Sequence, residues 1–294
     1  MKQKQIKRLL KYKLYFVIDM TIYIFGSNGM LGNYIKLYLK QQKESVVCFT
    51  RNDLDVATVT YDKLYQLFAN YKINEGDIII NCVGIIPQSK DINDTNIRSY
   101  FFINSVFPNM LSTVALQYKM KFLHITTDCV FSGSKGKYLE TDQHDETSVY
   151  GVSKSLGELS YNATIIRTSI IGEELKNKYS LLEWVRSHSR ETINGFKNHY
   201  WNGVTCLQLS KIIDKIIKQD IWWQGVRHIF SPQSVTKCKL VEIINLEYSL
   251  ENTINPIETN TTIDKTLDTI YDTNRLFNIP DIENQIREQV NYID

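Results

Sequence analysis

The sequence has few cysteines, and none of them are grouped. Its five cysteines, at positions 48, 82, 129, 206 and 238, are odd in number and form no CxxC pair. This pattern argues against a disulfide framework and against a zinc site, and it fits a reducing compartment. We therefore expect a cytoplasmic protein that holds no structural metal.

Long hydrophobic runs are also missing, and glycine and proline are scarce, with 13 and five residues among 294. No apolar run approaches the roughly 18 residues that a membrane-spanning helix needs. With 43% hydrophobic and 22% charged residues, the composition is ordinary for a globular protein. We expect one large α/β domain or a main domain with a smaller lobe, and no membrane contact.

An excess of basic charge is confined to the start of the chain. Residues 1–19 carry six basic groups against Asp19 alone, so the remainder has three more acidic than basic groups although the whole chain is +2. A slightly acidic body without a basic stripe does not match a nucleic-acid-binding protein. The start also lacks the apolar core and cleavage site of a signal peptide. We expect residues 1–19 to be a mobile basic extension.

From Met20 onward the sequence alternates between strand and helix patterns. Short apolar runs typical of buried strands are separated by helical spacing of apolar residues, and the runs lie at residues 21–25, 45–50, 77–84, 121–127 and 163–169. This order predicts an α/β fold with a Rossmann-type doubly wound parallel sheet over residues 20–172. After Gly172 the rhythm changes, and residues 173–294 are expected to form mainly a smaller C-terminal α/β lobe.

Several further elements are predicted from the same patterns. One long helix is expected over residues 96–118, and amphipathic helices are expected over 181–190, 207–218 and 239–248. Residues 226–230 read as a strand. The segment from Asn252 is polar and weakly patterned, and it predicts no particular element.

A glycine-rich loop stands between the first predicted strand and the first predicted helix. Gly26, Gly29 and Gly32 form a GxxGxxG pattern in "FGSNGMLG". Such glycines permit a tight turn, a close approach of the backbone to a pyrophosphate, and close helix–strand packing. The helix start then offers N–H groups and a partial positive charge to phosphates. We predict a dinucleotide site that also includes Asn28, Met30 and Leu31; the alternative is a helix cap that happens to be rich in glycine.

The end of the second predicted strand bears on the choice of cofactor. NAD-selective sites usually carry a carboxylate there, which bonds the ribose 2′-hydroxyl. Here the strand ends in "CFTRND", with Thr50 and Arg51 at that place. Arg51 can pair with a 2′-phosphate, so we predict NADPH in preference to NADH, with NADH still possible. Asp55, a little further along the same loop, is placed in the cofactor site as well; the alternative for Arg51 is a solvated loop residue.

A strand end and the following helix supply reactive side chains. "FLHITTDCVF" ends its strand at Thr127 and Asp128, and ligands of wound sheets lie outside the carboxyl ends of strands. Tyr150 and Lys154 follow on one helix face, one turn apart. A glycine loop, a strand-end hydroxyl, a tyrosine and a lysine in one domain predict a catalytic site. The structural alternatives are a surface tyrosine, a solvated lysine and a capping threonine.

These residues carry a resemblance to a known superfamily. "GSNGMLG", "NCVG" (residues 81–84), "TTDCVF", "YGVSK" and "IIRTSIIG" resemble the extended short-chain dehydrogenase/reductases, and most of all the dTDP-4-dehydrorhamnose reductase family. The resemblance implies that Tyr150 donates a proton to a carbonyl oxygen whose carbon receives hydride. Lys154 would bond the nicotinamide ribose and, with it, lower the pKa of Tyr150. Thr127 would orient the substrate carbonyl.

The resemblance assigns further residues on both sides of the reacting groups. Cys82, Val83 and Gly84 would contact the cofactor, and Asp128 would contact the substrate. In "NHYWNGVT", Trp201 and Asn202 could frame the sugar nucleotide, with Trp201 offering a flat apolar face to a pyranose or a base.

Two departures from the family pattern affect the expected chemistry. Related 4,6-dehydratases follow the threonine with an Asp–Glu pair, whereas here Asp128 is followed by Cys129, which points to simple ketone reduction. Cys129 stands where the family usually has tyrosine; it is either a small apolar side chain or an acid/base group as in epimerase-reductases. "TSIIG" also lacks the aromatic residue that is common in the family.

The resemblance implies reduction of the 4-keto group of a nucleotide-linked 4-dehydro-6-deoxyhexose of the 4-dehydro-L-rhamnose type, in rhamnose-type sugar synthesis. Two alternatives stay open. One is a non-catalytic regulatory subunit like that of methionine adenosyltransferase; the other is a related sugar-nucleotide epimerase or N-acetyl-hexosulose reductase. The nucleotide (dTDP or UDP), the stereochemistry at C4 and a possible homodimer are not determined by the sequence.

Overall fold

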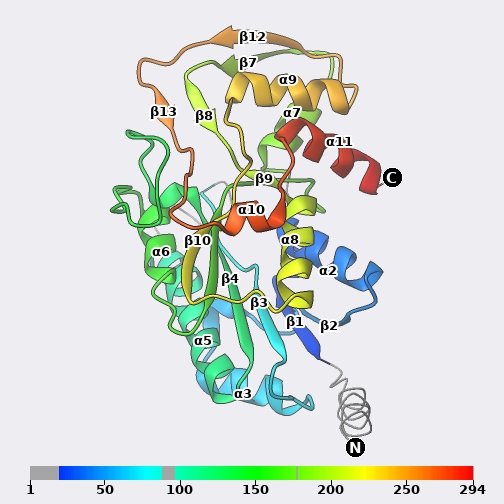
Figure 1. Cartoon of the computed structure of the whole chain (residues 1–294), viewed down its shortest axis with the longest axis vertical. Helices are drawn as coiled ribbons and strands as arrows, with labels where there is room; N and C mark the ends of the chain where they lie inside the picture. Colours follow the sequence, from blue (N-terminus) through cyan, green and yellow to red (C-terminus); the bar gives the residue numbers. More distant parts are fainter. Residues whose placement is uncertain (1–19, 88–96, 177, 294) are drawn as a thin grey trace, which may run out of the picture.

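The computed structural model describes residues 20–87, 97–176 and 178–293. A six-stranded parallel sheet forms its larger part (Figure 1). The spatial order is β2-β1-β3-β4-β5-β10, with β1 (Thr21–Phe25), β2 (Ser45–Phe49), β3 (Ile78–Asn81), β4 (Lys121–Thr127), β5 (Thr164–Thr168) and β10 (Gly225–His228). The predicted fold class is confirmed. The expected extension over residues 1–19 lies outside the described residues.

The strands of this sheet are apolar on both faces because helices cover both. Along β1, Ile22 and Ile24 belong to one core cluster, while Tyr23 and Phe25 belong to the other. All four residues of β3 are buried. Alternate side chains of a strand point to opposite faces, so each strand contributes to two cores.

Helices cover both faces of the sheet (Figure 1). One face packs against α2 (Met30–Gln41) and α8 (Cys206–Lys218), and the other packs against α3 (Tyr61–Ala69), α5 (Phe107–Gln117) and α6 (Val149–Gly157). Most of these helices pack through an apolar stripe, such as Leu31, Ile35 and Leu39 of α2. α6 differs, because its buried residues are Gly151, Ser153, Lys154 and Gly157. None of the helices in the described part of the chain is long and apolar enough to span a membrane.

The helix expected over residues 96–118 is interrupted. It comprises α4 (Ile97–Phe101), a π-helical turn at Phe102–Val106 and α5, and Asn96 lies outside the described residues. Within the turn, Asn104 and Ser105 are buried polar residues that bond to groups outside the helix. A π-turn adds a residue to the helical ladder and is frequent at functional sites.

A smaller lobe stands above the carboxyl ends of the strands (Figure 1). Its core includes Leu182, Ile193, Leu240 and Ile286. It is built from α7 (Leu181–Ser187), β7 (Thr192–Phe196), β8 (His199–Trp201), β11 (Val235–Thr236), α9 (Lys237–Glu247), β12 (Thr253–Ile257), β13 (Ile263–Asp264) and α11 (Ile282–Ile293). Its strands pair as β11-β8-β13 and β12-β7.

The chain passes between sheet and lobe more than once. After β6 (Ile170–Ile171), which pairs with β9 (Val204–Thr205), the chain builds part of the lobe, then returns as α8 and β10. It enters the lobe again at β11, and α10 (Thr273–Phe277) later packs near β10. A boundary near Gly172 stays a prediction, since α8 and β10 come from beyond it and complete the sheet layer.

Candidate active site

The strand order reverses between β1 and β3, at the carboxyl ends of the strands. We call the region between the loops at this point the crevice. β2 and β3 lie on opposite sides of β1, so the connections leaving β1 and those around β3 turn in opposite directions. In open α/β sheets, ligands bind at this switch point, outside the carboxyl ends of the strands. The loops that follow β1, β2, β3 and β4 meet here, and they contain the predicted site residues.

The loop after β1 is shaped by two close backbone approaches. Gly26 has φ +79°, which favours glycine, and a Cβ there would lie 3.0 Å from the backbone of Cys82. A Cβ on Gly32 would lie only 2.2 Å from the carbonyl oxygen of Gly26. Glycine at both positions lets α2 begin directly against the strand ends.

The start of α2 is suited to a phosphate. Its N-cap is Gly29, no side chain caps it, and no acidic residue stands in its first turn. The N–H groups at a helix start need acceptors and favour anions. Asn28 and Gly29 are exposed, whereas the Leu31 side chain is buried, so Leu31 has only its backbone to offer. These residues fit the diphosphate of a dinucleotide.

Hydrogen bonds within the loop after β2 fix its conformation. Asp53 Oδ2 accepts from the backbone N–H and from the hydroxyl of Thr50, both at 2.7 Å. Asp55 caps a short 3-10 turn by accepting from the N–H of Ala57 at 3.1 Å. Arg51 is exposed at the tip of this loop. Arg51 and Asp55 remain predicted cofactor contacts, and the Asp55 carboxylate already serves the turn.

The loop after β3 is fixed by Asn104, a residue that the sequence analysis did not single out. Its side-chain oxygen accepts from the N–H of Ile85 at 2.9 Å, and its amide donates to the Ile85 carbonyl at 3.1 Å and to the Ser153 hydroxyl at 3.0 Å. One side chain thus joins the loop containing Cys82, Val83 and Gly84 to α6. The sequence did contain a signal for this role, because Asn104 and Ser105 are adjacent polar residues within an otherwise apolar helical segment.

The strand end of β4 brings three polar side chains to the crevice. Thr127 Oγ1 donates to Asp128 Oδ1 at 3.1 Å and accepts from the N–H of Cys129 at 3.2 Å. Asp128 is only 4% exposed, and its pKa is raised because burial outweighs the charges of Lys237 and Lys265. Burial and the neighbouring Asp128 raise the pKa of Cys129 to about 12, so the thiol stays protonated and is poorly suited to act as a base.

Tyr150 and Lys154 lie on α6, whose start is capped by Ser148. Tyr150 is half-buried and shares a hydrogen bond with Thr127. Lys154 is buried, and its Nζ donates to the Ile125 carbonyl at 3.3 Å. A Cβ built on Gly84 would lie 3.6 Å from the same Nζ. The structure therefore places Thr127 beside Tyr150, and it places Lys154 one turn further along α6 against the loop after β3.

The pKa of Tyr150 does not follow the expectation from the resemblance. In the protein itself this pKa is raised, chiefly by burial and by the neighbouring Cys129, while the hydrogen bond with Thr127 acts in the opposite direction. Lys154 is not among the main groups that shift it, and burial lowers the pKa of Lys154 itself to about 8. Tyr150 is a neutral phenol at pH 7, which is the form that donates a proton.

A buried ion pair lies behind these residues. Glu158 stands one turn after Lys154 on α6 and opposes the effect of burial on the pKa of Lys154. Its carboxylate accepts from the Arg167 Nε at 2.9 Å and from the Arg167 NH2 group. Arg167, on β5, is fully buried. The pair connects the helix that carries Tyr150 to the central sheet.

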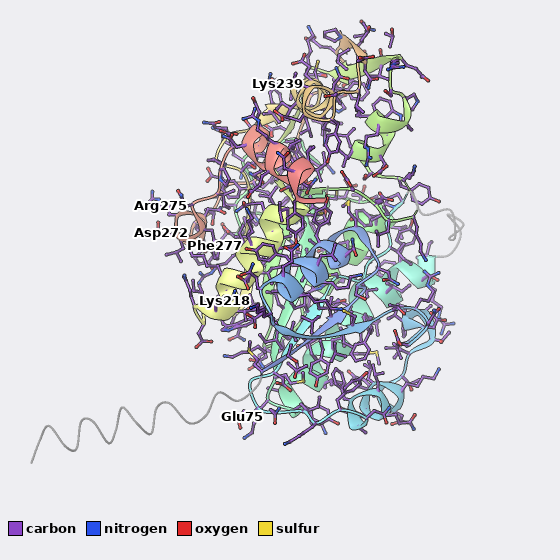
Figure 2. The ribbon with its side chains drawn as sticks, turned by 90° about the vertical axis from the view of Figure 1, so that its right-hand side faces the viewer. Glu75, Lys218, Lys239, Asp272, Arg275 and Phe277 are labelled. Carbon is purple, nitrogen blue, oxygen red and sulfur yellow. The ribbon has the colours of Figure 1, made fainter. Side chains whose placement is uncertain are left out.

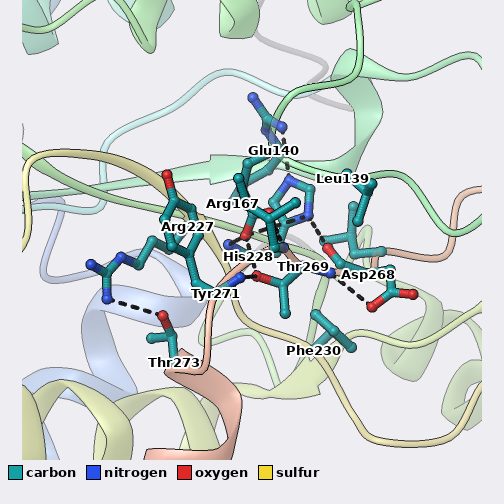
Figure 3. A network of polar contacts seen from close by, with 12 residues as sticks. Leu139, Glu140, Arg167, Arg227, His228, Phe230, Asp268, Thr269, Tyr271 and Thr273 are labelled. Carbon is teal, nitrogen blue, oxygen red and sulfur yellow. Dashed lines mark hydrogen bonds and ion pairs between the residues drawn. The ribbon is translucent and has the colours of Figure 1, made fainter.

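Two histidines extend this network, and Figure 3 shows the part around Arg167, His228 and Asp268. Arg167 donates to His228 Nε2 at 2.8 Å and to His144 Nε2 at 2.6 Å. Since a guanidinium can only donate, both Nε2 atoms are acceptors, and each ring carries its proton on Nδ1. His228 Nδ1 donates to the Asp268 carbonyl at 2.6 Å, and His144 Nδ1 donates to Ser155 at 2.5 Å. The network thus reaches from α6 to the segment that follows β13.

The predicted sugar contacts in the lobe have other roles. The side-chain amide of Asn202 hydrogen-bonds both backbone groups of Leu267. It donates to the carbonyl at 2.8 Å and accepts from the N–H at 2.9 Å. Trp201 is 3% exposed, and the Lys237 ammonium lies 5.2 Å from its ring centroid. The face expected for a pyranose is covered, so we correct the expectation: both residues support the lobe side of the crevice.

The comparison with known families decides the assignment. The sequence profile of the RmlD substrate binding domain family matches residues 20–268. The chain belongs to this family.

Relatives in this RmlD family share the architecture. A dTDP-4-dehydrorhamnose reductase of Aggregatibacter actinomycetemcomitans is 28% identical over 216 residues, covering 70% of this chain and 71% of that protein. A dTDP-4-keto-6-deoxy-D-glucose reductase of Streptomyces niveus is 28% identical over 238 residues, covering 77% of each. The structure of the dTDP-4-dehydrorhamnose reductase of Bacillus anthracis str. Ames in complex with NADP has a TM-score of 0.77 at 20% identity, covering 92% of this chain and 98% of that chain.

These findings confirm the family that the sequence motifs indicated. The relatives are named as reductases, and one of the similar structures holds NADP, in agreement with the predicted oxidoreductase class and cofactor. The roles of the individual residues remain predictions of the sequence and the geometry. The catalytic roles of Thr127, Tyr150 and Lys154 likewise stay predictions.

Proposed function

We propose that this protein reduces the 4-keto group of a nucleotide-linked 4-dehydro-6-deoxyhexose, with NADPH as the reductant. The observation that carries the proposal is the position of Thr127 beside Tyr150 at the carboxyl ends of the strands, with Lys154 one turn further along α6 against the loop after β3. The names of relatives in the same family support a dTDP-linked keto sugar as the substrate class. A site that carries these reactive groups favours an enzyme over a non-catalytic regulatory subunit.

The residues of this chain would have the following roles in the reaction. The nicotinamide, when bound, supplies the hydride that reaches C4 of the sugar. Thr127 would turn its single hydroxyl proton from Asp128 Oδ1 to the substrate carbonyl and so orient it. Tyr150, neutral at pH 7, transfers its phenolic proton to the carbonyl oxygen as negative charge develops there. Lys154 holds the ribose side of the site and restores the proton of Tyr150 through its own ammonium group.

The cofactor would lie along the strand ends. The uncapped start of α2 fits the diphosphate. Arg51 at the tip of the loop after β2 supplies a cation for a 2′-phosphate, which is the basis for proposing NADPH. Lys154 and the loop fixed by Asn104 would hold the nicotinamide end.

Replacing Tyr150 with Phe tests the proposal, with NADPH oxidation and product analysis on dTDP-4-keto-6-deoxyglucose as the assay. We expect turnover to fall by about 10²–10⁴, the usual contribution of a positioned general acid. Tyr161→Phe is a matched control, because that side chain is 71% exposed. If Tyr150→Phe keeps the wild-type rate, or if the wild type reduces no nucleotide-linked 4-keto sugar, the proposal is wrong.

A further inference from the structure

In the part of the chain that the structure describes, the outer surface of α5 and α6 exposes no charged side chain. Residues 99–118 contain no lysine, arginine, aspartate or glutamate, although about four would be expected at the chain's average of 22% charged residues. Within residues 149–162 only Lys154 and Glu158 are charged, and both side chains are buried. The water-facing side of a helix normally carries charged residues, as the lysines of α2 and α8 illustrate on the other face of the sheet.

Large apolar side chains occupy this uncharged surface instead. Val106, in the π-helical turn, Leu116 on α5 and Leu156 on α6 are each 40–51% exposed. Leu159, two residues after α6, is 72% exposed. Scattered exposed apolar residues are ordinary, whereas a contiguous group of them marks a binding surface. We call the surface that these four residues define the α5–α6 face.

An apolar hollow lies beside these side chains. Its volume is about 550 Å³, several times the roughly 150 Å³ of a cavity that holds benzene. The start of α3, the π-helical turn, α5 and the end of α6 form its walls, and Leu156 and Leu159 stand among its lining residues. Protruding leucines and a hollow that accepts apolar side chains therefore lie on the same face.

A second copy of this chain fits such a face. In a twofold-symmetric dimer the same patch of both subunits meets, so a side chain that protrudes from one copy can enter the hollow of the other. A patch with charges of one sign would repel its own copy, but the described residues of the α5–α6 face present no such charges. A charged partner surface would find no counter-charge here, since interface cores are depleted of charge on both sides.

The face is also large enough for a dimer. Residues 102–117, the π-helical turn and α5, are about 24 Å long at 1.5 Å per residue. α3 and α6 flank them, as contacts of Tyr61 with Thr113 and of Ser105 with Ser153 show (Figure 1). Three neighbouring helices are about 25–30 Å wide, and this footprint is close to the roughly 800 Å² per partner of a standard interface.

We infer that this protein forms a twofold-symmetric homodimer through the α5–α6 face. The inference goes beyond the proposed function and does not depend on it. α6 carries Tyr150 and Lys154, and the π-helical turn carries Asn104, which fixes the loop after β3. The partner would therefore pack against the outer side of the two helical segments that support the proposed reacting groups.

Light scattering after size-exclusion chromatography, with the full chain at several concentrations, tests the inference. The wild type should have twice the mass of one chain. Leu159→Glu brings two like charges into the apolar interface of a symmetric dimer, and it should raise the dimer Kd by about a hundredfold or more. Val106→Glu makes the same change from the π-helical turn and should have the same effect.

Leu246→Glu is the matched control. Leu246 on α9 is 69% exposed, close to the value for Leu159, but it belongs to the smaller lobe. This variant should remain dimeric, and circular dichroism melts identify any variant that does not fold.

Three results would overturn the inference: a monomeric wild type, a dimer that survives both Leu159→Glu and Val106→Glu, or a dimer that is lost in the Leu246 variant. A monomeric wild type would leave the face to another protein or to residues outside the described ranges. If such a monomer still reduced the keto sugar, the proposed function would stand, so the two proposals can fail separately.

Discussion

Arg167 and Glu158 form a buried ion pair directly behind the helix that carries Tyr150 and Lys154. Their side chains are 2% and 4% exposed, and two hydrogen bonds join them. The Arg167 guanidinium also lies 5.0 Å from the Phe131 ring centroid. The pair fixes α6 to β5 with groups that water does not reach.

Breaking this pair should destabilise the whole fold. Glu158→Gln leaves a guanidinium buried without its counter-charge, and we expect a loss of about 3–5 kcal/mol in the free energy of unfolding, measured by urea denaturation. Glu75→Gln makes the same chemical change at an ion pair with Lys119 that is about 70% exposed (Figure 2), and should cost less than about 1 kcal/mol. Similar losses for the two variants would contradict this.

Stability should fall in mild acid because His228 is buried and neutral. Burial and Arg167 lower the pKa of His228 from 6.5 to about 4. Because the folded pKa is depressed, the unfolded chain takes up the proton first, so stability is fully present above pH 6.5 and is lost as the pH falls toward 4. The loss should be on the order of 3 kcal/mol across that range.

Urea unfolding at several pH values between 7.5 and 4.5 measures this dependence. His228→Gln should flatten the curve, although His144, whose pKa is also lowered by burial, will contribute a remaining slope. His188→Gln is the control, since His188 is half-buried, bonds the Trp184 carbonyl and lies outside this network. A wild-type stability that stays constant down to pH 4.5 would show that the network tolerates protonation.

Two glycines of the loop after β1 should respond differently to alanine. At Gly32 a Cβ would lie 2.2 Å from the Gly26 carbonyl oxygen, so Gly32→Ala should displace α2 and cost about 1–3 kcal/mol. At Gly29 the nearest atom would be 3.3 Å away and the backbone angles suit alanine. Gly29→Ala should keep the fold but hinder NADPH, raising its Kd about tenfold or more. Thermal melts and fluorescence titration separate the two effects; identical behaviour would refute the distinction.

Arg51 should govern the choice of cofactor. Loss of a charge-assisted bond to a 2′-phosphate costs about 1.5–3 kcal/mol, so Arg51→Gln should raise KM for NADPH by roughly ten- to hundredfold. KM for NADH, which lacks that phosphate, should change little. Lys63→Gln is a suitable control, since Lys63 lies on nearby α3 and donates to the Thr58 carbonyl. Parallel changes for both cofactors would remove Arg51 from this role.

The sequence predicted the sheet and most of its helices because their patterns are local. Buried strands such as β3 read as unbroken apolar runs, and α8 begins within one residue of its predicted start. The π-helical turn was missed because apolar spacing changes little when one residue is added. Helix α11 was missed although Ile282, Ile286 and Val290 share one face; the intervening glutamine and asparagine residues hid the stripe.

The site was predicted where its residues follow strand ends and was missed where it depends on distant contacts. Thr127 was placed by its position at a strand end, and Tyr150 and Lys154 were placed by their spacing on the following helix. Trp201 and Asn202 were assigned to the substrate. In the structure Lys237 lies over the Trp201 ring and Asn202 bonds Leu267. Both partners are more than 30 residues away in the sequence, so local patterns could not reveal these contacts. The raised pKa of Tyr150 likewise reflects burial, which the spacing of Tyr150 and Lys154 cannot report.

The sixth strand of the sheet has a consequence for how the molecule is made. β10 pairs with β5 only after about 60 residues of intervening chain have been synthesised, and α8 closes the same face. A nascent chain released at Gly172 would therefore expose an open sheet edge and an uncovered apolar surface. Folding should proceed as a single cooperative event late in translation, and the two lobes should not be separable by limited proteolysis without loss of both.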